Sequence, residues 1–537
     1  MPLQWSQCGP LALRVQFASQ VNEEAFRTGL ALLHWLESRV NSADAEWVPA
    51  FTTLLVIPAT AMVRDRILSL LPEVPWPLAA PEGTEAQGRR VEIPVVYGGP
   101  DLARVAVHAG ISEAEVMARH STSEYRVHCL GFSPGFPYLG GLDPVLRTPR
   151  LESPRARVPA GSVAIGGEQT GIYPVDGPGG WNLIGWTPEH LVRPWEASTA
   201  AAFPVGAGDR VRFRSIQRSE ADAFPSVSPP PGEAMAVPGA SPCLRLLAGG
   251  LGITIQDAGR PGYRRFGVPS GGAMDPRAAA WANRLVGNPV GTPVLELCLQ
   301  GQRLEAMESG WVAITGSSPG PPGKAGGWSA FRVRSGEVLE FPPGADGLWT
   351  YLAIPGGVAA PRFFGSASQW PQAGMGKSLR PGEVLWRSPG GFFSPPTGIA
   401  ARRTTTDAQA PAGPCPSVAV WPGPQWDWFS EEDRARFLSS VWRVSARSNR
   451  LGYRLEGPLL SPPPGSLISE AVLAGCIQVP PGGQPLVTMP DGPTLGGYPQ
   501  LALVDPAHLP VAAQVRPGHV LRFFRAPGDP SRIPRWA

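Results

Sequence analysis

The sequence predicts a mainly β protein with α+β parts, divided into several domains, and three observations support this prediction. The chain has 537 residues, enough for roughly three or four domains of ordinary size. Glycine and proline each number 65, so turns are frequent, yet 43% of the residues are hydrophobic and 18 are tryptophan, which indicates packed structure. Apolar residues occur in short bursts between turn formers, as in short strands joined by tight loops.

Residues 1–95 are predicted to form a small α/β unit. Strands are expected where apolar residues alternate or run together, at residues 11–17, 51–57 and 91–97. Helices are expected where apolar residues recur at near-helical spacing, at residues 23–39 and 61–72. A further helix over residues 112–119 would begin with a capping box, because Ser112 precedes Glu115 by three positions.

Residues 96–214 are predicted to form a β domain around a stretch, 130–187, that is dense in glycine and proline. Glycine lets a ligand approach the main chain and proline fixes the shape of a loop, so the main chain would form this surface. Four arginines lie in the stretch, at Arg147, Arg150, Arg155 and Arg157. They indicate a rigid, concave, anion-tolerant site, and the alternative is a loop-rich β domain with a solvated basic rim.

Residues 215–242 lose all periodicity and are rich in proline, serine and alanine, which predicts a linker between two halves. The second half is expected to have two β-rich parts, residues 243–400 and 401–537. One pattern, an apolar residue, a turn with glycine and an alternating strand, occurs at residues 205–213, 333–341, 379–387 and 515–523. The repeat supports a modular chain, and the alternative is that it marks hairpins and nothing more.

A longer similarity also links the halves. Residues 158–174 and 479–499 each begin Val-Pro and end Tyr-Pro, with a threonine shortly before the tyrosine. The matched pairs are Thr170 with Tyr173, and Thr494 with Tyr498. This similarity predicts related β domains in the two halves and a site between paired barrels.

Composition argues against several functional classes. The net charge is +3 without blocks of Lys or Arg, so nothing requires nucleic acid or an anionic membrane. The six cysteines form no CxxC pair, which removes the usual zinc and redox patterns and leaves no predicted metal ligands. The N-terminus has no signal-peptide pattern and no apolar run reaches 18 residues, so a cytoplasmic soluble protein is expected.

Two catalytic motifs are near misses. Residues 131–135 match G-x-S-x-G, but aromatic residues, glycines and proline follow Ser133 where a nucleophile elbow needs a helix. Residues 376–378, Gly-Lys-Ser, resemble the end of a P-loop, but Pro371 stands where its first glycine should be. A loop and a surface turn are the better interpretations.

The remaining candidates for binding are polar residues in glycine-rich turns. In the first half they are Arg157, Ser162, Gln169, Thr170 and Tyr173. In the second half they are Asp257, Arg260, Ser270, Asn283, Thr494 and Tyr498. Asp257 and Arg260 could instead form a structural ion pair. Asp275 precedes a proline and is predicted to cap a helix that ends near Val286.

Several long motifs carry a family resemblance. GFSPGFPYLGG, PRARVPAGSVAIGGEQTGIYP and GPGGWNLIGWTP resemble the allophanate hydrolase subunit 1 family, which includes the B subunit of 5-oxoprolinase and KipI. ITIQDAGRPGYRRFGVPSGGAMD, ANRLVGNP and GCIQVPPGGQPLV resemble the allophanate hydrolase subunit 2 family, which includes the C subunit of 5-oxoprolinase and KipA. The resemblance covers nearly the whole chain and implies cyclophilin-like β-barrel domains, one in the first half and a pair in the second.

The resemblance implies a function as the B/C component of an ATP-dependent 5-oxoprolinase. Its cofactor would be ATP with Mg²⁺, its substrate 5-oxoproline, and its partner the separate A subunit of 5-oxoprolinase. No catalytic residue is assigned, and whether the chain forms a homo-oligomer is left open. Motifs expected to carry arginine are altered at residues 365–369 and at Asp491-Gly492, and Asn449-Arg450 replaces an expected Asp-Arg, which puts ligand affinity in the second half in doubt.

Two alternatives stay open. The same modules resemble the carboxyltransferase domain of biotin-dependent urea carboxylase, although this chain has no biotin attachment motif and no ATP-grasp region. The resemblance to KipI and KipA allows a regulator of a histidine kinase that has no enzymatic activity.

Overall fold

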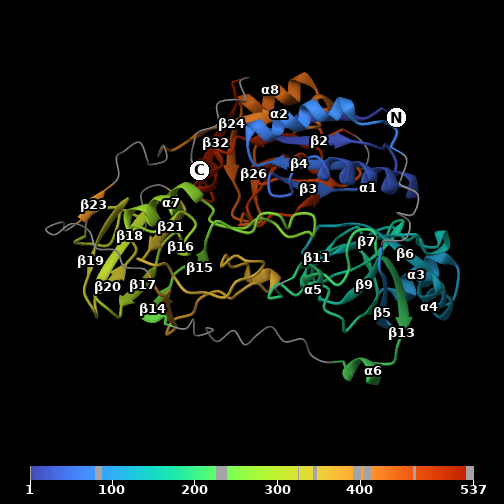
Figure 1. The fold of residues 1–537 in the computed structure, drawn as a ribbon, viewed down its shortest axis with the longest axis horizontal. Helices are drawn as coiled ribbons and strands as arrows, with labels where there is room; N and C mark the ends of the chain where they lie inside the picture. Colours follow the sequence, from blue (N-terminus) through green and yellow to red (C-terminus); the bar gives the residue numbers. More distant parts are fainter. Residues whose placement is uncertain are drawn as a thin grey trace.

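A computed structural model describes residues 2–78, 88–196, 198–224, 239–324, 326–342, 347–390, 413–463 and 467–527, together with the main chain of residues 401–403 (Figure 1). Half of the predicted linker, residues 225–238, lies outside the described residues. Within the predicted linker range, α6 (Arg218–Asp222) is a short helix and β14 begins at Ser241.

The N-terminal unit is a four-stranded antiparallel sheet with two helices. Its strand order is β1-β2-β4-β3, with bounds Gln4–Cys8, Ala12–Gln16, Thr53–Pro58 and Ala45–Pro49. The helices are α1 (Glu23–Glu37) and α2 (Ala61–Leu70), followed by the 3₁₀ turn Leu71–Glu73. The side chains of Asn22 and Thr60 cap the two helices by accepting from main-chain N–H groups. The helices and strands expected over residues 11–72 are therefore confirmed.

The first half continues with a closed seven-stranded barrel of order β10-β7-β6-β13-β5-β12-β9. In chain order its strands are β5 (Arg90–Tyr97), β6 (Glu124–Leu130), β7 (Pro137–Gly140), β9 (Ser162–Gly166), β10 (Gln169–Ile172), β12 (Asn182–Trp186) and β13 (Arg210–Ser215). The strand expected at residues 91–97 is thus β5, and it belongs to the barrel, where it pairs in parallel with β13.

Smaller elements surround this first barrel. They are α3 (Leu102–Ala109), α4 (Glu113–Thr122), α5 (Thr199–Ala202), the 3₁₀ turn Pro144–Leu146, and a two-stranded ladder of β8 (Arg155–Val158) and β11 (Gly177–Gly179). Ser112 caps α4 by accepting from the N–H of Glu115 at 3.2 Å, so the predicted helix start is confirmed.

Residues 241–403 form two open sheets among the described residues, not a closed barrel. One sheet has the order β20-β17-β14-β22, with bounds Val338–Glu340, Gln302–Ala306, Ser241–Gly249 and Val384–Arg387. The other has the order β15-β16-β21-β18-β19-β23, with bounds Ile253–Gln256, Val294–Cys298, Trp349–Ala353, Gly310–Gly316, Ser329–Val333 and Ala401–Arg403. Helix α7 (Pro276–Leu285) packs against β18 and β21, and a 3₁₀ turn lies at Pro371–Ala373.

The C-terminal part is a second closed barrel, of order β24-β31-β28-β29-β26-β25-β32. In chain order its strands are Ser417–Pro422, Val441–Val444, Gly452–Glu456, Cys476–Gln478, Leu486–Thr488, Gln500–Val504 and Val520–Arg525. Outside the barrel lie α8 (Glu431–Ser439), α9 (Leu509–Ala513), the 3₁₀ turn Trp426–Trp428, and the ladder of β27 (Glu470–Ala471) with β30 (Leu495–Gly496). Of the pair of barrels expected in the second half, one is therefore closed.

The two closed barrels have the same topology. Read around each barrel, β10-β7-β6-β13-β5-β12-β9 corresponds strand for strand to β29-β26-β25-β32-β24-β31-β28, with the same sequence order of strands. In each barrel the last strand pairs in parallel with the first and antiparallel with the second. This correspondence confirms the prediction of related β domains in the two halves.

The same correspondence shows that the predicted alignment of residues 158–174 with 479–499 is wrong. Gly161 and Gly475 are equivalent, because each lies directly before the corresponding strands β9 and β28 and each has a positive φ, 82° and 88°. Gly161 donates to the carbonyl of Tyr173 and Gly475 to that of Thr488, both at 2.7 Å. Tyr173 therefore corresponds to Thr488, not to Tyr498. The shared Val-Pro and Tyr-Pro pairs are turn residues outside equivalent strands.

The glycine turn that recurs four times precedes the strands β13, β20, β22 and β32. Its glycines have φ values of 91°, 81°, 92° and 86°, in the region that favours glycine. Each glycine N–H donates at 2.7–2.8 Å to a carbonyl of a neighbouring strand; the glycines are Gly208, Gly336, Gly382 and Gly518. The glycine turn before a strand is therefore present at all four places. Among the described strands, none of these turns closes a hairpin, because each following strand pairs with strands from earlier in the chain and not with the one just before it.

The halves share two apolar cores. One joins the N-terminal sheet and the first barrel to Ala471 and Leu495 of the β27–β30 ladder beside the C-terminal barrel. The other joins Phe203 of the first half to Phe364 and Met375 of the second. In Figure 1 the N-terminal sheet, in blue, lies beside the C-terminal barrel, and the first barrel lies below it. None of the helices in the described ranges has the length and hydropathy needed to cross a bilayer.

Candidate functional site

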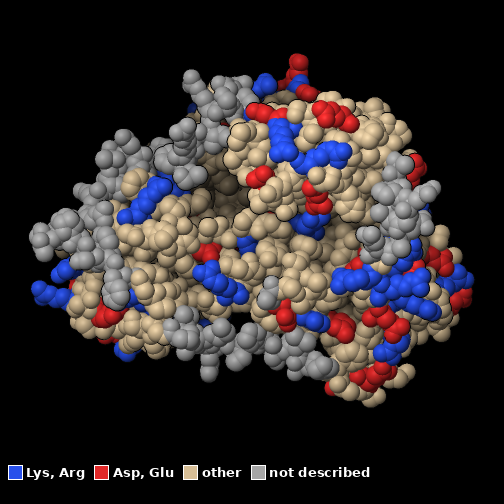
Figure 2. Space-filling view, in the orientation of Figure 1, with Lys and Arg blue, Asp and Glu red and all other residues tan. Residues whose placement is uncertain are grey.

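Residues 257–275, here called the junction loop, connect β15 to α7 and contact every other part of the molecule. The carbonyl of Phe266 accepts from the N–H of Gly135 at 2.8 Å, in the β6–β7 loop of the first barrel. The N–H of Gly271 donates to the carbonyl of Pro490 at 3.1 Å, in the C-terminal barrel. Arg264 contacts Glu46 of the N-terminal sheet at 3.4 Å. Figure 2, drawn in the orientation of Figure 1, shows a hollow between the C-terminal barrel and the sheets of residues 241–403.

Beside the junction loop lies a buried group of charges, here called the ion clamp, formed by Glu296, Arg450 and Asp491. Arg450, between β25 and β26, donates from Nε and Nη2 to the two carboxylate oxygens of Asp491 at 2.7 and 3.0 Å. Its Nη1 donates to Glu296 on β16, and its Nη2 also donates to the carbonyl of Gly272 at 2.7 Å. The ion clamp therefore joins the C-terminal barrel to the sheets of residues 241–403.

Burial controls the electrostatics of the ion clamp. Desolvation raises the pKa of Glu296, although Arg450 opposes this shift. Desolvation alone would lower the pKa of Arg450, but Asp491 and Glu296 together raise it. The Tyr351 hydroxyl donates to Glu296 at 2.8 Å and the Met274 N–H donates to the same oxygen at 2.7 Å. Each member of the clamp thus has its hydrogen-bonding partners.

Arg260, in contrast, is buried without a carboxylate partner among the described residues. It is 1% exposed, and its Nη2 donates to the carbonyl of Ser368 while its Nη1 donates to the Met375 sulfur at 3.2 Å. Its Nε has no acceptor within the described chain. Desolvation lowers the pKa of Arg260. The nearby carboxylates of Asp491 and Asp257 oppose this shift, but neither forms an ion pair with Arg260. A buried charge without a direct ion pair is costly, which makes Arg260 the strongest candidate for binding a ligand.

The alternative in which Asp257 and Arg260 form a structural ion pair is not realised in the structure. The carboxylate of Asp257 instead accepts from the Ser366 hydroxyl at 2.5 Å and from the N–H groups of Ala367 and Gly259 at 2.7 and 2.8 Å. Asp257 therefore fixes the two segments that flank Arg260.

Ser270 lies in the same region and links Arg260 to the first half. Its carbonyl accepts from the N–H of Arg260 and its hydroxyl from Arg264, both at 2.7 Å. Arg264 in turn contacts Glu46 of β3. Three sequence-predicted residues, Asp257, Arg260 and Ser270, are therefore brought together in the junction loop.

Asp275 and Asn283 have structural contacts. Asp275 caps α7 by accepting from the Ala278 N–H at 2.9 Å, which confirms the predicted cap. Its other carboxylate oxygen accepts from Gln514 at 2.9 Å. Asn283, buried in α7, donates to the carbonyl of Thr292 at 2.8 Å and so holds the loop that follows the helix.

The first-half candidates are spread over the barrel. Arg157 is an exposed residue of β8 and pairs with Asp176 at 2.6 Å. The hydroxyl of Ser162 donates to the carbonyl of Pro159 at 2.7 Å. Gln169 is half-buried at the start of β10. The structure does not bring these side chains into contact with the junction loop.

Tyr173 and Thr494 lie at the contact between the halves. Tyr173 packs edge-on against Phe136 with ring centroids 5.2 Å apart and shares an apolar core with Leu495. Thr494 is fully buried and its hydroxyl has no partner within the described chain. Tyr498, by contrast, is 43% exposed.

Thr170 lies inside the first barrel and belongs to a hydrogen-bonded chain with His120 and Tyr97. The Thr170 hydroxyl donates to the carbonyl of Ala164 at 3.0 Å, so its oxygen accepts from His120 Nε2 at 2.9 Å. His120 Nδ1 then accepts from the Tyr97 hydroxyl at 2.7 Å. This arrangement requires a neutral imidazole, and desolvation lowers the pKa of His120 from 6.5 to about 3.

We expect the first barrel to lose stability in mild acid through His120. The unfolded chain binds a proton as the pH falls below 6.5, whereas the folded chain does not until about pH 3. Between pH 7 and pH 5 this difference removes about 2 kcal/mol from the free energy of unfolding. The variant His120→Gln should show a weaker pH dependence in urea denaturation, and His108→Gln, an exposed position on α3, should behave as wild type. An unchanged slope in His120→Gln would contradict the assignment.

The two motif near misses have ordinary structural contexts. Ser133 lies in the loop between β6 and β7, and a strand follows it instead of a helix, so the predicted absence of a nucleophile elbow is confirmed. Lys377 follows the 3₁₀ turn Pro371–Ala373, is more than half exposed and pairs with Glu383 at 2.9 Å. It lies in a turn, as expected.

The sequence analysis does not predict Glu296, Tyr351, Ser368, Arg450 and Asp491 as site residues. They lie on separate strands and loops, and the sequence signals for three of them are the altered family motifs at residues 365–369, Asn449-Arg450 and Asp491-Gly492. No group of three or more His, Cys, Asp or Glu side chains in the described ranges could hold a metal ion.

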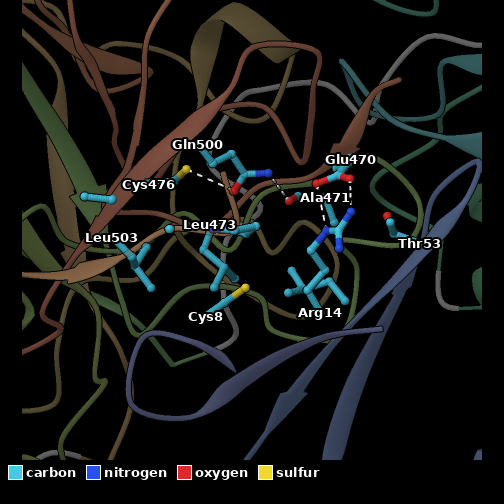
Figure 3. A pocket seen from close by; sticks show the side chains of 13 residues that line it. Cys8, Arg14, Thr53, Glu470, Ala471, Leu473, Cys476, Gln500 and Leu503 are labelled. Atoms are coloured by element: carbon cyan, nitrogen blue, oxygen red, sulfur yellow. Dashed lines mark hydrogen bonds and ion pairs between the residues drawn. The ribbon is translucent and has the colours of Figure 1, made fainter. Parts of the chain in front are cut away.

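A second polar contact joins the halves away from the junction loop (Figure 3). Arg14 of β2 donates from Nε to Glu470 of β27 at 3.0 Å and pairs with it again through Nη2. Gln425 also donates to Glu470, at 3.1 Å. The cavity beside this pair has a volume of about 10 Å³, which is about the room for one water molecule, and Cys8 and Cys476 line it. The contact between Arg14 and Glu470 is therefore better suited to joining the two halves than to binding a ligand.

Comparisons with known proteins agree with the two-half organisation. Residues 3–203 match the family model "Carboxyltransferase domain, subdomain C and D", and residues 266–525 match "Carboxyltransferase domain, subdomain A and B". The chain is 38% identical over 240 residues to the B subunit of 5-oxoprolinase from Bacillus subtilis, which covers 41% of this chain and 96% of that protein. It is 33% identical over 297 residues to the C subunit of 5-oxoprolinase from Escherichia coli, which covers 52% of this chain and 91% of that protein.

A solved structure matches nearly the whole chain. The crystal structure of TTHA0988 is 35% identical with a TM-score of 0.81, and the match covers 96% of this chain and 99% of that one. The predicted family is therefore confirmed: the chain belongs to the family of 5-oxoprolinase subunits B and C, with the carboxyltransferase C/D and A/B domains fused in one chain.

Proposed function

We propose that this chain is the B/C component of an ATP-dependent 5-oxoprolinase that acts with the separate A subunit of that enzyme. One observation carries the proposal: both halves match 5-oxoprolinase subunits, B then C, over more than nine-tenths of each relative's length. The reaction would convert 5-oxoproline, ATP and water to glutamate, ADP and phosphate.

The chemistry fits a site built for positioning and charge stabilisation. A five-membered lactam is a poor electrophile, and transfer of the terminal phosphoryl group of ATP to its carbonyl oxygen creates a good leaving group. Water then adds to the activated carbon and the ring C–N bond breaks, which leaves an acyl phosphate. A second water hydrolyses this acyl phosphate to the carboxylate and phosphate. Such steps need oriented N–H donors and cationic side chains rather than covalent catalysis by the protein.

We assign ligand binding first to the junction loop. Arg260 supplies a buried cation that lacks a carboxylate partner among the described residues, and Ser270 and Asp257 hold the segments around it. The first-half residues Arg157 and Tyr173 remain candidates for nucleotide contacts. Since Mg²⁺ commonly binds through nucleotide phosphates and one or two carboxylates, it would enter with ATP.

Reconstitution with a homologue of the 5-oxoprolinase A subunit tests the proposed function. We expect glutamate to form from 5-oxoproline only when ATP, this chain and the A subunit are all present. The matched controls omit ATP or this chain. Absence of ATP-dependent glutamate in the complete mixture would contradict the proposal.

A second candidate is a carboxyltransferase component of urea metabolism. Urea amidolyase of Lachancea kluyveri is 31% identical over 319 residues, which covers 52% of this chain but 17% of that protein. This role requires a biotin-bearing partner, because the motif is missing from this sequence. Affinity capture separates the candidates: a homologue of the A subunit supports the lactam hydrolase, a biotinylated protein the carboxyltransferase, and a histidine kinase a KipI–KipA-like regulator.

A further inference from the structure

Three polar side-chain atoms converge on one side of Gly271 in the junction loop. A β-carbon built on Gly271 would lie 3.2 Å from Ser368 Oγ, 3.5 Å from Arg260 Nη1 and 3.6 Å from Asp491 Oδ1. These atoms come from three different segments of the second half. Gly271 is partly exposed, whereas the three side chains around it are buried, so a small ligand could reach them there.

The three atoms keep hydrogen-bonding capacity beyond their observed contacts. Arg260 Nη1 carries two N–H groups, and its acceptor is a thioether sulfur, which is weak. Asp491 Oδ1 accepts from Arg450 at 3.0 Å and has a further lone pair. Ser368 Oγ accepts from the Gly272 N–H at 2.8 Å and donates to Gln256. A strong donor and a strong acceptor therefore both lie within 3.6 Å of one point beside Gly271.

A donor beside an acceptor suits a neutral amide better than a free anion. Asp491 Oδ1 would repel a phosphate or carboxylate oxygen placed between it and Arg260. In a five-membered lactam the ring fixes the amide N–H and C=O on the same edge, so one face of the molecule offers a donor next to an acceptor. We propose that the amide edge of a cyclic lactam binds beside Gly271, with its C=O toward Arg260 and its N–H toward Asp491.

This assignment rests on the proposed function and names the residues that would recognise its substrate. It is tested by calorimetric titration of the full chain with 5-oxoproline and with N-methyl-5-oxoproline, which lacks the amide donor, each with and without a non-hydrolysable Mg²⁺–ATP analogue. We expect 5-oxoproline to bind, and the N-methyl compound to bind at least about tenfold more weakly, because it leaves Asp491 without its donor.

Two glycine variants form a matched pair. Gly271→Ala puts a methyl group among the three polar atoms, whereas Gly262→Ala, in the same loop and also at positive φ, meets nothing within 4 Å. Both carry the strain of alanine at positive φ, so a shared loss of folding would appear in both. We expect Gly271→Ala to weaken 5-oxoproline binding at least about tenfold and Gly262→Ala to bind as wild type.

Equal binding of 5-oxoproline by wild type and Gly271→Ala, equal binding of the two lactams, or no lactam binding under either condition would overturn the assignment. Failure of the proposed function looks different: lactam binding would persist while the reconstituted mixture forms no ATP-dependent glutamate. Conversely, ATP-dependent turnover of both lactams at equal rates would keep the proposed function and exclude this recognition mode.

Discussion

The variant Arg450→Ala is expected to lower the free energy of unfolding by about 3–5 kcal/mol. The change removes the cation of the ion clamp and leaves Glu296 and Asp491, 1% and 2% exposed, as uncompensated buried charges. These side chains also join the C-terminal barrel to the sheets of residues 241–403, so both parts should be affected. Urea denaturation followed by tryptophan fluorescence measures the loss, since Trp442 is buried in the C-terminal barrel.

Two controls separate charge from packing in this experiment. Arg454→Ala removes an exposed arginine on the adjacent strand β26, and we expect it to stay within about 0.5 kcal/mol of wild type. The triple variant Arg450→Met, Glu296→Gln and Asp491→Asn removes the buried charges together and should recover most of the loss. If Arg450→Ala unfolded like wild type, the ion clamp would not be a stabilising contact.

The variant Arg260→Met is expected to lose activity while keeping its stability, in contrast to Arg450→Ala. It removes a buried cation that has no carboxylate partner among the described residues, so the free energy of unfolding should stay the same or rise. The rate of ATP-dependent glutamate formation should fall by a factor on the order of 10²–10³, as when a charge-stabilising donor is lost from an active site. Denaturation and the reconstituted assay together measure the two effects.

The matched control for Arg260→Met is Arg265→Met. Arg265 lies in the same loop but is partly exposed and pairs with Glu37 at 3.1 Å. Its replacement should leave glutamate formation near the wild-type rate. A strong destabilisation of Arg260→Met, with activity falling only in proportion to the unfolded fraction, would mean that Arg260 is a structural residue.

Features set by neighbouring residues were predictable from the sequence. Ser112 and Asp275 cap their helices because a cap depends on residues a few positions away. The recurring glycine turns were recognised because a positive φ favours glycine wherever it occurs. The alignment of residues 158–174 with 479–499 failed for the same reason, since turn residues recur without marking equivalent strands.

Contacts between distant segments could not be predicted in this way. Arg450 lies 154 positions from Glu296 and 41 from Asp491, so their pairing depends on how barrels and sheets pack. Arg260 was recognised as a candidate by its place in a glycine-rich turn, but its lack of a carboxylate partner is a property of the folded molecule. The closed strand order of each barrel likewise follows from long-range pairing.

The two apolar cores that join the halves have a consequence for assembly. The 5-oxoprolinase subunits that match these halves are separate proteins, each matched over more than nine-tenths of its length. In this chain the matching halves meet within one molecule, at an effective concentration that a short connection can raise to the millimolar range. Docking of the halves is therefore a first-order process, insensitive to dilution, and it fixes their stoichiometry at one to one.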